Sequence, residues 1–194
     1  MSGPFDADGD ATPLAPEERN GLIPTHISYR HELNELEQQN ILEADRWAFG
    51  RKRNVLDESF LRSLHRRMFN RVWRWAGDYR ITERNLGIES YRIQPELVQL
   101  LDDARYWVAN NTYAPDELAV RVHHRLVFIH PFPNGNGRWS RMAADLLIVG
   151  LDGLRFTWGN MNLQAPGDIR RAYIDALHEA DNHDLEPLIM FARS

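Results

Sequence analysis

A segment of twelve residues, HPFPNGNGRWSR at positions 130–141, limits more than any other what this chain can fold into. Apolar residues with helical spacing run into it from position 118, and a second such pattern runs out of it as far as position 149. Between these patterns, glycines at 135 and 137 flank an asparagine, and glycine adopts left-handed backbone angles at little steric cost. The sequence therefore predicts two helices joined by a tight turn.

The same helical period fills most of the remaining chain. Apolar residues recur every three or four positions near residues 29–52, 57–69, 95–108, 116–129, 138–150, 168–180 and 185–192. Residues 80–94 lose this period and place isolated apolar residues among polar ones around Gly87, which predicts a small β-hairpin or an irregular flap. The predicted fold class is all-α, a helical bundle with a small β-hairpin flap.

Length and composition indicate one globular domain. The chain has 194 residues, enough for a sizeable core, and prolines among small and acidic residues predict an extended N-terminal arm over residues 1–24, before a domain over 25–194. The net charge of −5 gives no attraction to nucleic acid. The chain has no cysteine and no apolar run of membrane-spanning length. We therefore expect a cytoplasmic protein with no membrane and no nucleic-acid partner.

The groups in the 130–141 segment are suited to act together on a phosphate. His130 titrates near neutral pH and can accept a proton from a hydroxyl group. The backbone amides of residues 135–137 can point into one concavity, and a helix beginning near Arg138 adds its own N–H groups and dipole. Arg138 and Arg141 lie three positions apart, on one side of the first helical turn. This combination is typical of a site that transfers a phosphate-linked group.

The segment resembles the signature of the Fic family, H-x-F-x-(D/E)-G-N-G-R-x-x-R, and departs from it at one fixed position, where Asn134 replaces the acid. Residues 75–80, WAGDYR, resemble the family's stretch before its target-docking flap, and residues 173–177, YIDAL, resemble another recurring run. The likeness covers roughly residues 25–192. More narrowly, the chain resembles the bacterial group called mobile mystery protein B.

The resemblance implies a Fic-like fold and the activity of a protein adenylyltransferase, which moves AMP from ATP onto a Ser, Thr or Tyr hydroxyl of a target protein. His130 would then take the hydroxyl proton during in-line attack on the α-phosphorus, and pyrophosphate would leave. The flap over residues 80–94 would hold the target segment by strand addition, through Leu86, Gly87 and Ile88. A surface loop without a partner is the alternative for this flap.

The resemblance also assigns residues to nucleotide binding. The backbone of three residues would cradle phosphate oxygens: Gly135, Asn136 and Gly137. Asn136 would in addition contact phosphate, and Arg138 and Arg141 would bind the outer phosphates. Tyr173 is a candidate neighbour of the nucleobase, although the apolar face of its helix makes core packing an equal alternative.

Asn134 raises a question about the metal. The acid that the family has at this position helps to hold Mg²⁺ between the phosphates. The amide oxygen of Asn134 can still ligate a hard cation, but without the negative charge. We expect ATP to be the substrate and Mg²⁺ to bind more weakly. Two alternatives stay open, namely another phosphate-containing substrate, or a protein that binds nucleotide and turns over poorly.

A built-in inhibitor is a further prediction from the resemblance. Many Fic proteins carry a helix with the pattern (S/T)-x-x-x-E-(G/N), whose glutamate pairs with the second signature arginine. Ser28 and Glu32 match the first part of this pattern, which predicts an inhibitory helix near residues 28–36 and a Glu32–Arg141 ion pair. The alternative is that Ser28 caps the first helix and that Glu32 lies in its favourable dipole region.

A second class of function stays open beside the enzyme. The chain could be a regulatory module that keeps a nucleotide pocket and acts through a partner. The mobile mystery protein B group is typically found beside a small helix-turn-helix companion, which implies a toxin–antitoxin-like pair. The expected partners are therefore a target protein with a hydroxyl side chain and, for this alternative, a small helix-turn-helix protein.

Overall fold

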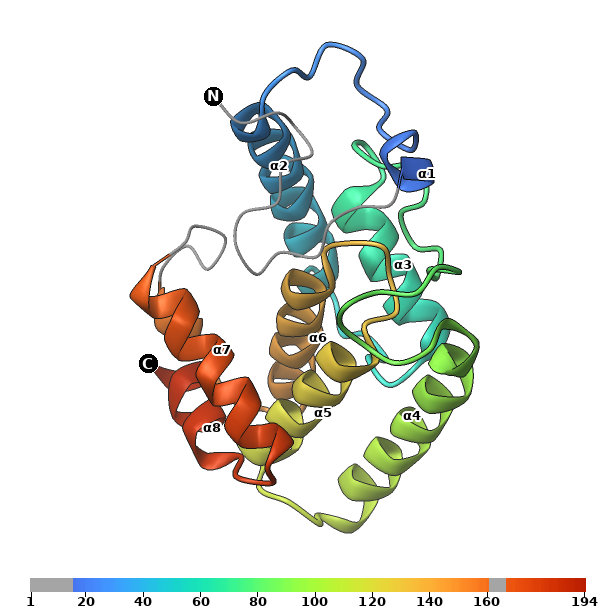
Figure 1. Cartoon of the computed structure of the whole chain (residues 1–194). Helices are drawn as coiled ribbons and strands as arrows, with labels where there is room; N and C mark the ends of the chain where they lie inside the picture. The colour runs from blue at the N-terminus through green and yellow to red at the C-terminus, as the bar shows by residue number, and fades with distance from the viewer. Residues whose placement is uncertain (1–15, 161–166) are drawn as a thin grey trace.

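The computed structural model describes residues 16–160 and 167–194, and its regular elements are helices (Figure 1). In chain order these are α1 (Pro16–Arg19), α2 (Arg30–Phe49), α3 (Glu58–Phe69), η1 (Ser90–Arg92), α4 (Ile93–Asn110), α5 (Pro115–Ile129), α6 (Asn136–Gly150), η2 (Trp158–Asn160), α7 (Asp168–Asp181) and α8 (Glu186–Arg193). Among the described residues, β-type pairing is limited to an isolated bridge between Leu22 and Trp73. The predicted all-α fold is confirmed. None of the helices in these two ranges combines the length and apolar character that crossing a membrane requires.

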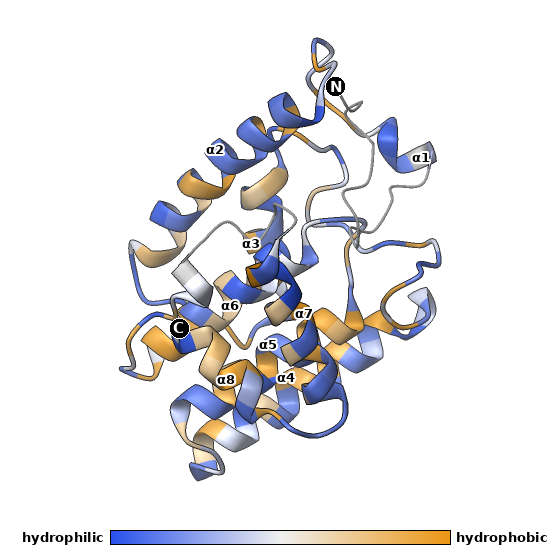
Figure 2. Ribbon diagram, turned by 60° about the vertical axis from the view of Figure 1, so that its left-hand side comes forward, coloured by the Kyte–Doolittle hydropathy of each residue, from blue (hydrophilic) through white to orange (hydrophobic). Residues whose placement is uncertain are grey.

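Two helices, α5 and α6, form the centre of the molecule and pack against each other. α2 pairs with α3 on one side, α4 lies against α5, and α7 pairs with α8 on the other side (Figure 1). Hydrophobic residues, orange in Figure 2, gather on α5 and the helices beside it. The 130–141 segment thus connects the two central helices, as the flanking apolar patterns predict.

Phe132 anchors the turn between α5 and α6. Its side chain is fully buried, its ring stacks on that of His65 with 3.6 Å between the ring centres, and the ring of Trp139 meets it edge-on. Gly135 has a φ of +79°, and a Cβ at this position would lie 2.5 Å from the ring of Phe69. The turn therefore requires glycine at this point for its backbone angle and for space.

The predicted β-hairpin flap is not formed. Residues 81–89 consist of bends and irregular backbone, and η1 then runs directly into α4, which begins at Ile93 rather than at residue 95. The guanidinium group of Arg80 donates to Thr82 O at 3.0 Å and to Ile88 O. One arginine thus binds carbonyl groups at both ends of the flap, and no partner strand is needed to satisfy them. The irregular flap, the second form that the sequence allows, is the one observed.

Part of the predicted N-terminal arm packs against the domain. Residues 1–15 lie outside the described residues, whereas α1 and the residues after it are placed. Glu18 O accepts a hydrogen bond from Trp75 Nε1 at 3.0 Å, and the backbone of residues 21–23 bonds to that of residues 72–74. This part of the chain is therefore not an extended arm, because its backbone groups find partners beside two tryptophans.

Candidate active site

A cavity of about 640 Å³ opens where the 130–141 segment and the flap meet α2, α5 and α7. The predicted site residues that line it are Leu86, Gly87, His130, Asn134, Gly135, Asn136, Gly137, Arg138, Arg141 and Tyr173. Ser28, Glu32 and Ile88 are not among its lining residues. The fold therefore brings the predicted base, phosphate-binding and flap residues around one cavity, without the predicted inhibitory pair.

His130 is positioned by the end of α5. Its backbone is left-handed, with φ 53° and ψ 59°, and its ring Nδ1 lies 3.3 Å from Val127 O. A carbonyl oxygen can only accept, so Nδ1 carries the proton and Nε2 is the basic nitrogen. Burial lowers the pKa of His130 to about 4, which keeps the imidazole neutral near pH 7. The side chain is thus in the form that a general base needs.

The start of α6 presents backbone amides to the cavity. Trp139 N–H bonds back to Gly135 O at 2.9 Å, and the N–H groups of residues 136–138 precede this bond at the positive end of the helix dipole. A Cβ added at Gly137 would make only an ordinary contact, 3.7 Å from Arg141 Nη1, so the structure has room for a side chain at this position. A phosphate group suits this cradle in charge and hydrogen bonding.

The side chain of Asn136 is used within the turn. Its Oδ1 accepts from Phe132 N at 2.9 Å, and its Nδ2 donates to Phe132 O at 2.8 Å. The residue is 2 % exposed. Asn136, to which the resemblance assigns a phosphate contact, therefore holds the turn closed with its side chain and presents its backbone N–H to a ligand.

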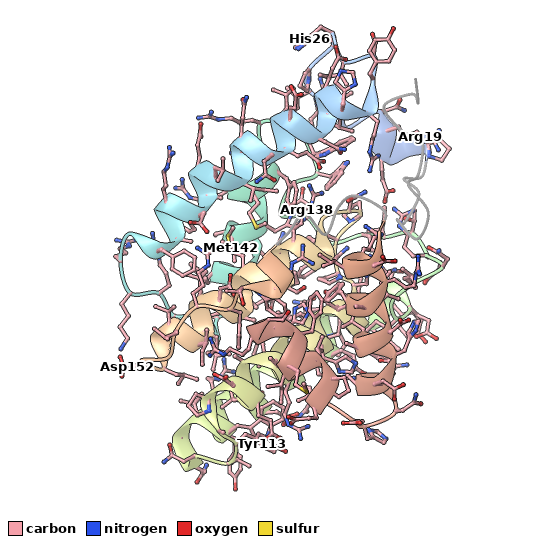
Figure 3. The ribbon with its side chains drawn as sticks, turned by 90° about the vertical axis from the view of Figure 1, so that its left-hand side faces the viewer. Arg19, His26, Tyr113, Arg138, Met142 and Asp152 are labelled. Carbon is pink, nitrogen blue, oxygen red and sulfur yellow. The ribbon has the colours of Figure 1, made fainter. Side chains whose placement is uncertain are left out.

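Arg138 is held by an acid from α2. Its Nη1 donates to Glu37 Oε2 at 2.6 Å, and Glu37 Oε1 accepts from Trp73 Nε1 at 2.6 Å. Figure 3 labels Arg138 at the start of α6, on the side that faces α2. Glu37 shares the cavity-lining face of α2 with Arg30 and Asn34, at helical spacings of three and four residues. A carboxylate thus occupies one edge of the guanidinium group that is predicted to bind phosphate.

Arg141 lies over Tyr173, with 5.3 Å between its guanidinium carbon and the ring centre. The Tyr173 side chain is buried and its hydroxyl group lies 3.0 Å from Nε2 of the buried His123. Burial raises the pKa of Tyr173. The two roles that the sequence leaves open for Tyr173 are compatible, because its ring packs in the core and also forms a wall of the cavity.

Asn134 is a poor metal ligand in this arrangement. Its Oδ1 accepts from Gly135 N at 2.6 Å, and its backbone oxygen accepts from the ring of His65. Within the two described ranges, no three acidic or histidine side chains are arranged to hold a metal ion. One neutral oxygen that is already hydrogen-bonded does not match the carboxylate ligands that Mg²⁺ prefers. We assign no step of the chemistry to a protein-bound metal.

The predicted Glu32–Arg141 ion pair is not formed. Glu32 Oε2 accepts hydrogen bonds from Ser28 N at 2.8 Å and from Tyr29 N at 3.0 Å. These backbone bonds lower the pKa of the Glu32 carboxyl group. Glu32 therefore stabilises the start of α2, where Tyr29 rather than Ser28 is the N-cap residue.

Two residues that the sequence analysis did not select organise the site. His65 is buried on α3, its Nε2 lies 3.0 Å from Asn134 O and its Nδ1 accepts from Gly77 N at 3.0 Å. Since Nδ1 accepts, Nε2 carries the proton and donates. Glu37 is the other such residue. Each is a polar residue at a buried position of its helix, as Asn40 also is on α2. A polar residue within the apolar stripe of a helix is the signal that could have found both.

The comparison with protein families agrees with this geometry. The family model described as the Fic/DOC family matches residues 55–148. This range contains α3, the flap and the whole 130–141 segment. Residues 55–148 are therefore similar to a Fic/DOC domain.

A curated relative of this chain is considerably longer. The chain is 31 % identical over 120 residues to protein adenylyltransferase fic-1 of Caenorhabditis elegans, a match that covers 60 % of this chain and 22 % of that protein. It therefore spans about a fifth of the length of this curated relative.

Two solved structures share the fold of this chain. The N-terminal Fic domain of a VirB-translocated Bep effector of Bartonella quintana, with bound ADP, has a TM-score of 0.67 at 19 % identity and covers 91 % of this chain and 94 % of that chain. BepC of Bartonella tribocorum, with bound AMPPNP, has a TM-score of 0.67 at 20 % identity, and the match covers 92 % of this chain and 97 % of that chain. Both comparisons establish the Fic fold for nearly the whole chain.

The buried histidines of this chain predict a steep loss of stability in acid. Burial lowers the pKa of His65 to about 3, of His130 to about 4, and of His123 well below its usual value. The unfolded chain binds protons at these residues below about pH 6.5 while the folded protein does not, so the free energy of unfolding falls as the pH drops from 7 to 5. The slope near pH 5 reaches at most ~4 kcal/mol per pH unit. Urea unfolding at pH 7, 6 and 5 measures it.

The control for this prediction is His183→Asn, which removes an exposed histidine. It leaves the slope unchanged. A free energy of unfolding that stays constant between pH 7 and pH 5 contradicts the prediction.

Proposed function

We propose that the chain is a protein adenylyltransferase that moves AMP from ATP to a Ser, Thr or Tyr hydroxyl group of a target protein. The observation that carries the proposal is that His130, the amides at the start of α6 and the guanidinium groups of Arg138 and Arg141 surround one cavity. A neutral base beside a phosphate cradle matches transfer to a hydroxyl group. The relative named above as a protein adenylyltransferase, and the Fic structures with bound ADP and AMPPNP, support the same assignment.

In the proposed reaction, the hydroxyl oxygen of the target attacks the α-phosphorus of ATP in line. Its proton passes to Nε2 of His130, the bond from the α-phosphorus to the bridging oxygen breaks, and pyrophosphate leaves with that oxygen. The amides of residues 136–138 bind phosphate oxygens, and Arg138 and Arg141 bind the outer phosphates as negative charge moves to the leaving group. Positioning and charge compensation supply most of the catalysis.

The flap is the proposed docking place for the target protein. Leu86 is partly exposed and lines the cavity together with Gly87, so both lie next to the proposed base. The Ile88 carbonyl already accepts from Arg80. Strand addition by the target therefore uses the backbone groups on the outer side of the flap.

The decisive experiment separates AMP transfer from phosphate transfer. The protein is incubated with a mixture of candidate target proteins and ATP labelled at either the α- or the γ-phosphate. Transfer of the α-label alone is expected, and His130→Ala lowers it by about 10²–10⁴-fold. His178→Ala is a control, since it changes a cavity-lining histidine that has no role in the proposal. Transfer of the γ-label, or equal transfer by His130→Ala, would falsify the assignment.

We also propose that Glu37 restrains the enzyme in its resting state. A nucleotide phosphate and the Glu37 carboxylate require the same guanidinium group of Arg138, at which the carboxylate lies 2.6 Å away. α2 is therefore the proposed autoinhibitory element, as the sequence analysis expects, but it acts through Glu37 and Arg138 rather than through Glu32 and Arg141. Trp73 fixes the carboxylate in this position.

The variant Glu37→Gln tests the restraint. Glutamine can still accept from Trp73 Nε1, but it removes the charge that competes with phosphate, so we expect nucleotide affinity and α-label transfer to rise about tenfold, equivalent to ~1.4 kcal/mol. Glu35→Gln, an exposed change on the same helix, gives the baseline. A fall in transfer by Glu37→Gln would mean that Glu37 orients Arg138 for catalysis and does not inhibit.

Weak binding of Mg²⁺, caused by Asn134 in place of an acid, is the third element of the proposal. Mg²⁺ would enter with the nucleotide and be bound mainly by phosphate oxygens and water, since Asn134 supplies no charge. The variant Asn134→Asp should lower the Mg²⁺ concentration at half-maximal transfer several-fold, and isothermal titration with nucleotide should detect tighter binding. Asn85→Asp places a charge elsewhere on the cavity wall and serves as the control. Equal Mg²⁺ dependence of wild type and Asn134→Asp contradicts this element.

The second candidate function is a regulatory module that binds nucleotide and turns over poorly. The occupied guanidinium group of Arg138 and the uncharged Asn134 favour it over a fast enzyme. The helix-turn-helix partner of a toxin–antitoxin-like pair and the resemblance to mobile mystery protein B belong to this candidate and stay predictions. Nucleotide binding without transfer of either label is the result that distinguishes it.

A further inference from the structure

Arg80 is a buried arginine whose hydrogen bonds end mainly on backbone carbonyls. Its side chain is fully buried. Nε donates to His130 O at 2.7 Å, one terminal nitrogen donates to Thr82 O at 3.0 Å, and the other donates to Ile88 O and to Ile129 O. One guanidinium group therefore links both ends of the flap to the residue proposed as the catalytic base.

The charge of Arg80 is balanced chiefly by dipoles. Arg80 forms an ion pair with Glu83, which is 3.9 Å away and 63 % exposed on its side chain, and the charge of Glu18 also acts on it. Burial lowers the pKa of Arg80, which expresses the cost of placing its charge there. The carbonyls of Ile129 and His130 lie at the C-terminal end of α5, where the helix dipole is negative and the last oxygens lack helical partners. Arg80 thus serves as the cation that caps α5.

The backbone of His130 needs such a cap. Its φ of 53° is in the left-handed region, which is unfavourable for a residue with a Cβ and persists only where neighbouring contacts enforce it. Besides the guanidinium contacts, Arg80 N donates to Pro131 O at 2.9 Å. Arg80 therefore holds the carbonyl oxygens of three consecutive residues, and these three define the direction in which the His130 ring leaves the chain.

Gly87 joins the flap to the same place. It has a φ of +90°, and a Cβ there would lie 2.5 Å from His130 Cβ and 2.9 Å from Arg80 Nη2. The flap backbone at Gly87 therefore packs directly against His130 and against Arg80. Movement of the flap relative to His130 requires movement of Arg80.

We propose that Arg80 is a positioning residue that fixes the His130 imidazole relative to the flap. The base and the hydroxyl group of a target docked on the flap then keep a constant relative position. This inference rests on the proposed function. Arg80 does not touch the nucleotide in it and takes no part in proton transfer. Its contribution is the alignment of two elements, the end of α5 and the flap, that approach the reacting hydroxyl group from different sides.

The chemistry of the guanidinium group makes the proposal specific. Its planar fork donates to several carbonyls in fixed directions at once, whereas the ammonium group of lysine is a single compact donor centre. Arg80→Lys keeps the charge and loses the fork. A displacement of about 1 Å at a reacting group can cost 10²-fold in rate, so we expect α-label transfer by Arg80→Lys to fall by about that factor. ATP affinity should stay within about threefold, since the amides and arginines of α6 are unchanged.

The test combines kinetics with a measurement that does not depend on activity. Nitrogen-15 NMR of the histidine side chains reports the tautomer of His130 and the pH at which it takes up a proton. In the wild type we expect the Nδ1–H tautomer to persist down to about pH 4. In Arg80→Lys we expect a changed His130 spectrum and an unchanged spectrum of the surface residue His183. Arg62→Lys is the matched control, because Arg62 also donates to a backbone carbonyl, Gly77 O at 3.0 Å, but lies away from His130.

The outcomes separate this inference from the proposed function. If the wild type transfers neither label, the proposed function fails, and the NMR comparison still decides whether Arg80 sets the His130 ring. If the wild type transfers AMP while Arg80→Lys matches it in rate and in its His130 spectrum, the positioning role is wrong. Should Arg80→Lys not fold, Gly87→Ala replaces it, because the added Cβ displaces the same contact. An unchanged rate and spectrum in Gly87→Ala then overturns the proposal.

Discussion

The fold and the site both depend on the hydrogen bonds of a short buried turn between the two central helices. A buried turn has backbone N–H and C=O groups that neither helix can satisfy, and leaving them without partners would cost more than the turn can sustain. Side chains from the turn itself and from distant parts of the chain supply the partners. Asn136 binds Phe132, His65 binds Asn134, and Arg80 binds His130. The turn is rigid because three polar side chains are buried around it.

The same buried contacts determine the chemistry. Burial between α5 and the flap lowers the pKa of His130 and keeps its ring neutral. The packing of α2 against α6 places the Glu37 carboxylate next to Arg138. Negative charge is excluded from the turn itself, where Asn134 and Asn136 use their amide groups within the backbone network. The cavity therefore has the neutral imidazole of His130 and, among its lining arginines, Arg138 and Arg141 at the start of α6. Its only close acidic contact with those arginines in the described residues comes from α2.

The sequence was sufficient for the longer helices, the central turn and many of the residues around the cavity. Helical spacing of apolar residues identifies which face of each helix is buried, and Gly135 identifies the turn through its backbone angle. The spacing could not identify what each buried polar residue touches, because Glu37 and Arg138 are 101 residues apart. Motif spacing selected Glu32, which uses its carboxylate on the adjacent backbone. For the flap the sequence left a small β-hairpin and an irregular form open, because residue spacing does not reveal that the Arg80 side chain binds the carbonyls of Thr82 and Ile88.

The position of α2 has a consequence for how such a domain can diversify. The family match begins at residue 55, after α2 has ended, whereas the carboxylate against Arg138 comes from within α2. The proposed catalytic residues and the helix proposed to restrain them are thus encoded in separate stretches of the gene. Under that proposal, substitutions or length changes upstream alter the resting state of the enzyme while the downstream stretch stays constant. Regulation of this kind is modular along the chain, although the contact that carries it is a single ion pair between Glu37 and Arg138.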